Sequence, residues 1–249
     1  MSLLLSLILG LATPPAAISP DASVEVILEA VDARSATLET YSATVRLDSL
    51  DGLSEETERR FGHVHFTAEP RRAAIVFDRT IDPDGRARER LEHYVYADGV
   101  LSDYDHEAKR LVKRELIKPG ETRDPLRLGE GPIPVPFAQR KADILKVFEV
   151  TLGTLPPEAL VKDPACVVAL SLVPKPGTVL SENKDLISID LWIERATGSP
   201  LAVRMNESDG DTVSARFFKA SFNSEIDKDA KRWLLAPDVD PREWRIESR

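Results

Sequence analysis

The sequence is poor in the residues that most often carry covalent or catalytic chemistry. Cysteine occurs once, as Cys166, so no disulfide can form within the chain, and we expect this residue to be a small buried hydrophobe. The 249 residues include only four histidines and no basic cluster. The net charge of −9 argues against nucleic acids and anionic membrane surfaces as main partners.

Recognisable catalytic motifs are also absent. The chain has no Gly-x-Ser-x-Gly, no phosphate-binding loop and no dinucleotide fingerprint, and we therefore predict a protein that is not an enzyme and needs no cofactor. His63 and His65 lie two residues apart and share one strand face, where two imidazoles could bind a metal. No third ligand is evident, and His93 and His106 have no partners at ligand spacing. We predict no metal site, and a metal-dependent hydrolase is the least favoured alternative.

Long hydrophobic runs are limited to the beginning of the chain. Residues 3–12 form an apolar stretch that is too short to anchor in a bilayer, and small residues and prolines follow it. This is typical of a secretory signal peptide, and we assign residues 1–17 to it, with cleavage after Ala12 or Ala17. The expected mature protein, residues 18–249, is a single domain that is exported, soluble and periplasmic.

What the sequence does contain is alternation typical of β-strands. In residues 186–194, Ile187, Ile189, Leu191 and Ile193 fall on one face and polar residues on the other. Short turns connect this segment to two further strands, which end at Phe222 and complete an antiparallel meander. The same reading along the chain gives about eleven short strands. A sheet this large curls, and its apolar face needs a cover.

Two amphipathic helices could provide that cover. The first is expected from Ser19 and Pro20, a cap followed by a first-turn proline, to about Glu39. The second is expected to place Phe137, Ile144, Leu145 and Phe148 on one stripe. The stretch 118–136, which precedes it, holds five prolines and is expected to be an irregular hinge.

Several local patterns, in this order, resemble the LolA-type periplasmic lipoprotein carriers and their relatives. They are the Gly62–Pro70 and Arg72–Phe77 segments, the Asp98-Gly99 hairpin followed by Tyr104-Asp105, the segments 172–175 and 187–193, the Thr197–Pro200 turn and the Asp209-Gly210 turn. The resemblance runs from the first helix to about Pro237. It implies a mainly β fold with helices (α+β), an incurved, half-open antiparallel barrel under a helical lid.

The resemblance also implies a function. Such a protein carries lipid acyl chains or lipoproteins in a hydrophobic cavity, receives them from envelope donor proteins and passes them to acceptors; we expect a monomer. The alternative is an envelope sensor or scaffold of the same fold that binds a protein partner. The residues expected to line the cavity are Val45, Leu47, Phe66, Ile75, Phe77, Phe137, Ile144, Leu145, Phe148, Leu191, Val203 and Met205.

Overall fold

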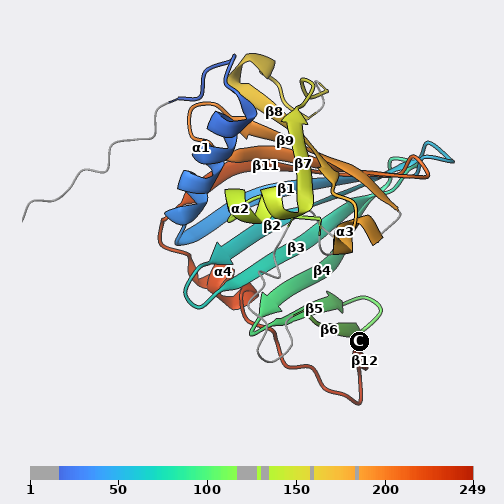
Figure 1. Ribbon diagram of the computed structural model, residues 1–249. Coiled ribbons are helices and arrows are strands. Elements are labelled where there is room, and N and C mark those ends of the chain that lie inside the picture. Colours follow the sequence, from blue (N-terminus) through green and yellow to red (C-terminus); the bar gives the residue numbers. More distant parts are fainter. Residues whose placement is uncertain (1–16, 117–127, 130–134, 158–159, 183–184, 249) are drawn as a thin grey trace, which may run out of the picture.

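One large open sheet dominates the computed structural model, which describes residues 17–116, 128–129, 135–157, 160–182 and 185–248 (Figure 1). The strand order is β12-β6-β5-β4-β3-β2-β1-β11-β10-β9-β8-β7. The strands are β1 Thr40–Leu50, β2 Thr57–Thr67, β3 Arg72–Ile81, β4 Ala87–Ala97, β5 Val100–Asp105, β6 Arg110–Glu115, β7 Phe148–Leu152, β8 Val167–Pro174, β9 Leu186–Glu194, β10 Pro200–Glu207, β11 Thr212–Phe222 and β12 Arg245–Ser248.

The sheet consists of two antiparallel meanders joined side by side. Strands β1 to β6 follow one another through turns, and so do β9 to β11, whereas longer connections with a 3-10 turn and α3 join β7 to β8 and β8 to β9. The seam is the β1–β11 pair, in which Leu47 lies opposite Ala215. The expected count of eleven strands is one too low. The twelfth strand, β12, pairs with β6 in parallel, because the chain returns to this edge along the outside of the sheet.

Helices are few and short. In the described ranges they are α1 Val24–Ala36, α2 Lys141–Val147, α3 Val179–Glu182 and α4 Lys228–Trp233, with one 3-10 turn at Pro164–Cys166. The first helix begins later than expected, since Ser23 and not Ser19 accepts the capping hydrogen bond, from the Val26 amide. The amide of Ile18 instead donates to the Arg195 carbonyl, which holds the chain before Ser23 against the β9–β10 turn.

The two faces of the sheet carry different cores. The inner face, toward α1 and α2, bears the largest apolar cluster, with buried residues from β1 to β4 and β7 to β11. The outer face has two smaller clusters. Helix α4 and the tail that follows it, including Trp233, Leu234 and Trp244, pack over Ala74 and Val95. At the other end, Leu160 and Val161 pack with Trp192, and the half-buried Cys166 lies against this group.

One bulge changes the expected pattern of burial. Ile187, predicted to face the core with Ile189, has 51% of its surface exposed. The β9–β10 register shifts between Asn206 and Glu207, so Leu186 takes the buried position in its place.

The expected signal peptide, residues 1–17, lies almost wholly outside the described residues, as does most of the expected hinge, 118–136. None of the helices in the described ranges combines the length and the apolar character needed to cross a bilayer.

Candidate functional site

The inner face of the sheet is a continuous apolar surface built by strand alternation. One row runs across five strands through Leu170, Leu191, Val203, Ala215 and Leu47, all of them fully buried. Because cross-strand neighbours lie within contact distance, such rows merge into one surface. Eleven of the twelve expected site residues belong to this cluster: Val45, Leu47, Phe66, Ile75, Phe77, Phe137, Ile144, Phe148, Leu191, Val203 and Met205.

Two helices form a roof over this surface. Helix α1 buries Ile27, Leu28 and Val31, the stripe that its sequence predicts. The much shorter α2 buries only Ile144 and Val147. In Figure 1, α1 and α2 lie on the same side of the sheet, near β11, β1 and β2. The apolar surface that α1 and α2 bury is therefore narrower than the apolar inner face of the sheet.

The expected placement of Leu145 is wrong. Its exposed fraction is 37%, and it lines an open surface cavity of about 590 Å³ with Asp32 and Arg140 rather than the inner face. The helix is also shorter than expected. Ala138 has a positive φ of 60° and Phe148 already belongs to β7, so only Ile144 and Leu145 of the expected stripe are helical, and adjacent helical positions face different ways.

Phe137 reaches the inner face from the segment before α2. Its ring stacks on Tyr41 with the centroids 4.5 Å apart, and it meets Phe66 and Phe217 edge-on at 5.9 and 6.1 Å. Burial raises the pKa of Tyr41 well above its ordinary range. Aromatic contacts of this geometry add to the stabilisation from buried area, so Phe137 is an anchor of the roof.

Polar contacts at the surface fasten α2 to α1. The Arg140 Nε atom lies 2.7 Å from Asp32 Oδ1, and the Lys141 amide donates to the same oxygen at 3.0 Å. The Lys141 ammonium pairs with Glu25 and Glu29 on α1. The hydrogen bond from Arg140 holds the pKa of Asp32 below its ordinary value. Because water screens exposed ion pairs, these contacts orient α2 more than they stabilise it.

The part of the inner face on β4 and β5 is charged, which the apolar alternation of the strands did not predict. Glu92 Oε2 lies 3.0 Å from Arg60 Nη1, its other oxygen lies 3.1 Å from Arg90 Nε, and Arg90 Nη2 lies 3.1 Å from Asp105 Oδ2. Burial raises the pKa of the nearby Tyr94 to about 12. The sequence does contain a pattern that indicates this placement. In β4, Glu92 and Tyr94 alternate with His93 and Val95, which face outward, so Glu92 and Tyr94 face inward.

The histidines have structural roles on the outer face. The rings of His63 and His65 stack with centroids 6.3 Å apart, and His65 Nδ1 lies 3.0 Å from Ser42 Oγ. Burial is the main cause that lowers the pKa of His65 to about 4. Among the described residues, neither histidine belongs to a group of three side chains able to hold a metal.

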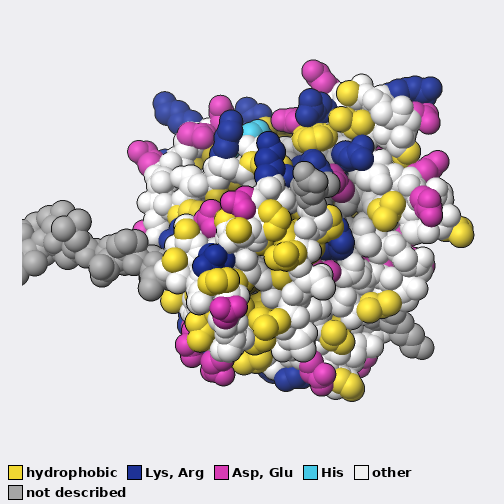
Figure 2. Space-filling view, turned by 90° about the horizontal axis from the view of Figure 1, so that it is seen from above, with side chains coloured by type: hydrophobic (Ala, Val, Ile, Leu, Met, Phe, Trp, Pro, Cys, Tyr) yellow, Lys and Arg dark blue, Asp and Glu magenta, His cyan; other side chains and the backbone are white. Residues whose placement is uncertain are grey.

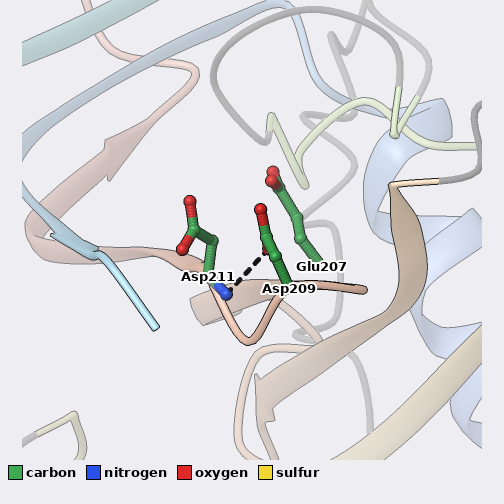
Figure 3. Close-up of side chains that lie close together, drawn as sticks. All are labelled: Glu207, Asp209 and Asp211. Carbon is green, nitrogen blue, oxygen red and sulfur yellow. Dashed lines mark hydrogen bonds between the residues drawn. The ribbon is translucent and has the colours of Figure 1, made fainter. Parts of the chain in front are cut away.

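The one such group in the described ranges is Glu207, Asp209 and Asp211 (Figure 3). Its hydrogen bonds are those of the β10–β11 turn. Asp209 Oδ1 accepts from the Asp211 amide at 3.0 Å, and Asp211 Oδ1 accepts from the Gly52 amide at 2.7 Å. These bonds explain the carboxylates as turn and loop contacts.

Comparison with known proteins finds similarity to solved structures but not to protein families or curated sequences. No protein-family model and no curated protein matches the sequence. An uncharacterized conserved protein from Thermus thermophilus is 13% identical with a TM-score of 0.48, and the match covers 90% of this chain and 98% of that one. Lipoprotein LppX of Mycobacterium tuberculosis is 10% identical with a TM-score of 0.42, and the match covers 82% of this chain and 99% of that one.

A LolA superfamily protein from Nitrosomonas europaea is also similar. It is 10% identical with a TM-score of 0.38, and the match covers 83% of this chain and 96% of that one. A protein of the superfamily that the sequence motifs resemble is thus among the structures similar to this chain.

Proposed function

We propose that this protein is a carrier that binds the acyl chains of lipids or lipoproteins between the inner face of the sheet and the roof formed by α1 and α2. The observation that carries the proposal is the mismatch between these surfaces. The inner apolar cluster has buried side chains from nine strands, whereas α2 contributes only Ile144 and Val147 to it. Moving α2 aside would expose a large apolar surface, and such surfaces are typical of binding sites.

The energetics favour an acyl chain as the occupant. Each methylene that leaves water contributes ~0.8 kcal/mol, so a chain of ordinary length can replace the contacts of two aliphatic side chains. The polar links from Arg140 and Lys141 to α1 are exposed, so opening the roof returns their charges to water. Phe137 would have to leave its place between Tyr41 and Phe66.

The cellular role belongs to the same proposal. Residues 1–17 would direct export, residues 18–249 would act in the periplasm as one monomeric domain, and donor and acceptor proteins of the envelope would load and unload the cargo. The protein would carry out no chemical reaction.

Adjacent residues of α2 supply a matched test. Ile144→Glu places a charge in the buried contact, whereas Leu145→Glu places the same charge on the exposed side of the same helix. We expect a fluorescent fatty-acid probe to bind the parent and Leu145→Glu equally and to bind Ile144→Glu at least about tenfold more weakly. Circular dichroism should show the same strand content in all three.

Native mass spectrometry of the purified parent should reveal co-purified lipid. Probe binding to Ile144→Glu with the parent's affinity would contradict the site. A parent that binds no probe and carries no lipid would contradict the carrier function and favour the sensor or scaffold alternative.

A further inference from the structure

The middle of the outer face is not covered by either outer cluster. Helix α4 and the tail pack over β3 to β6, and the segment with Leu160 and Val161 packs over β8 to β10. Between them, outward-facing residues of β10, β11, β1, β2 and β3 form two neighbouring cross-strand rows.

Arginine dominates these rows. The first row runs through Ala202, Arg216, Arg46, Phe61 and Arg79, each directly opposite the next. The second row runs through Arg204, Ser214, Asp48 and Arg59. We call the five arginines, Arg46, Arg59, Arg79, Arg204 and Arg216, the arginine band. In a chain with a net charge of −9, such a concentration of one cationic residue type is unusual and calls for a physical reason.

Aromatic rings hold three of these guanidinium groups in place. Arg79 lies 4.4 Å from the centroid of Phe61, Arg216 lies 4.4 Å from that of Phe218, and Arg204 lies 5.5 Å from that of Trp192. Stacking leaves the N–H groups in the guanidinium plane directed sideways. The three guanidiniums are therefore held in fixed orientations; Arg204 Nε also donates to Ser214 Oγ at 3.1 Å, and the exposed Arg79 presents paired donors of the kind that recognise carboxylates.

The band also keeps two like charges opposite each other. Arg46 and Arg216 are direct cross-strand partners, and burial together with the charge of Arg46 lowers the pKa of Arg216. Like charges in this position destabilise a sheet. Asp48 pairs with Arg46 and offsets part of this repulsion. A further anion laid across the row would offset more of it.

We propose that the arginine band is a docking surface for an acidic polypeptide segment of a partner protein. Carboxylates on such a segment would bridge the stacked arginines of neighbouring strands. The site is on the opposite face from the proposed acyl-chain site, so a partner could bind there while cargo is present.

A peptide fits the surroundings better than an anionic bilayer. The β1–β2 and β10–β11 turns, at the ends of these strands and alongside the second row, meet through the Gly52–Asp211 hydrogen bond. They bring Asp51, Glu55, Glu56 and Asp209 to the border of the band. These acids would repel a broad anionic surface, whereas a narrow segment can lie between them. Figure 2 shows basic and acidic side chains interspersed near the upper border of that view.

The test uses a labelled synthetic peptide of alternating Glu and Ser, with Gln in place of Glu as its neutral control. Fluorescence anisotropy should show that the parent binds the Glu peptide, that binding weakens strongly between ~0.05 and ~0.5 M salt, and that the Gln peptide does not bind. The double variant Arg59→Glu, Arg79→Glu changes two exposed arginines of the band and should bind at least about tenfold more weakly.

The matched control is Arg86→Glu, Arg242→Glu, which makes the same charge change at two exposed positions outside the band and should keep the parent's affinity to within about twofold. The charge-conserving variant Arg59→Lys, Arg79→Lys should bind the Glu peptide with an affinity between those of the parent and the double Glu variant, because lysine keeps the charge and loses the paired donors. Equal loss in both double Glu variants would reduce the effect to net charge and overturn the proposal. Binding to vesicles containing phosphatidylglycerol, but not to the Glu peptide, would overturn it in favour of a membrane.

Discussion

His93 Nε2 lies 2.8 Å from the carbonyl oxygen of Trp233, a residue 140 positions later in the chain. The bond joins β4 to α4 across the outer face. Since a carbonyl only accepts, Nε2 must carry the proton. The ring is fully buried between Tyr104 and Trp233, and burial lowers its pKa to about 4. The contact that holds the C-terminal segment is therefore made by a neutral histidine.

This arrangement predicts a loss of stability in acid. The unfolded histidine has a pKa of ~6.5, so between pH 6.5 and 4 the unfolded chain binds more protons than the folded one, and stability falls as the pH falls. His93→Gln keeps a donor for Trp233 and removes the titration. Its unfolding free energy should fall less than that of the parent between pH 7.5 and 5, by ~1–2 kcal/mol. Urea unfolding at both pH values measures this, and equal losses in the two proteins would refute it.

The face assignment of β9 gives a second prediction. Ile189 is fully buried on the inner face, and Ile189→Asp should destabilise the fold by ~4 kcal/mol or more, because it buries an unpaired charge. Its neighbour Asp190 faces outward, where its Oδ2 atom accepts from Asn206 at 3.0 Å. Asn can keep this bond, so Asp190→Asn should cost less than ~1 kcal/mol. Thermal melting compares the two, and similar losses would mean that the strand faces are reversed.

Gly62 supplies a third prediction. A Cβ atom at this position would lie 1.8 Å from the Val76 carbonyl oxygen, at the point where the β2–β3 register shifts. We expect Gly62→Ala to cost ~3 kcal/mol or more, because backbone of β3 would have to move. Gly85 is a suitable control. It has a φ of 82° with open space around it, so Gly85→Ala should cost only ~1–2 kcal/mol for the left-handed backbone. Denaturant unfolding that ranks Gly85→Ala as the worse change would contradict the close approach.

Alternation predicted most of the sheet because each strand buries one face. Alternation did not predict the features of the structure that depend on contacts between distant parts of the chain. Strand β12 contains one large apolar residue, Ile246, and its pairing with β6 depends on the path of the tail over the outer face. The bulge that turns Ile187 outward depends on the partner strand. The late start of α1 depends on a hydrogen bond between Ile18 and Arg195, far apart in sequence.

For the candidate site, periodicity predicted which strand residues face inward. It did not predict how α1 and α2 pack on them. It placed Leu145 and Ile144 together on one stripe, although adjacent residues of a helix point about 100° apart. Apolar alternation did not predict the ion pairs of Glu92 with Arg60 and Arg90, because charged residues on a strand usually face solvent. The arginine band could not be predicted from the sequence, because its members come from five strands spread over 170 residues of sequence.

The seam between β1 and β11 has a consequence for how the chain acquires its structure. Each meander can assemble from neighbouring hairpins, but Leu47 cannot meet Ala215 until nearly the whole chain has been synthesised. Contacts of such long sequence separation form slowly, because a large loop must close before they stabilise anything. The nascent chain would keep the open edge of β1 unpaired during synthesis, and deletion of β11 should leave a product that is prone to aggregate rather than a smaller stable domain.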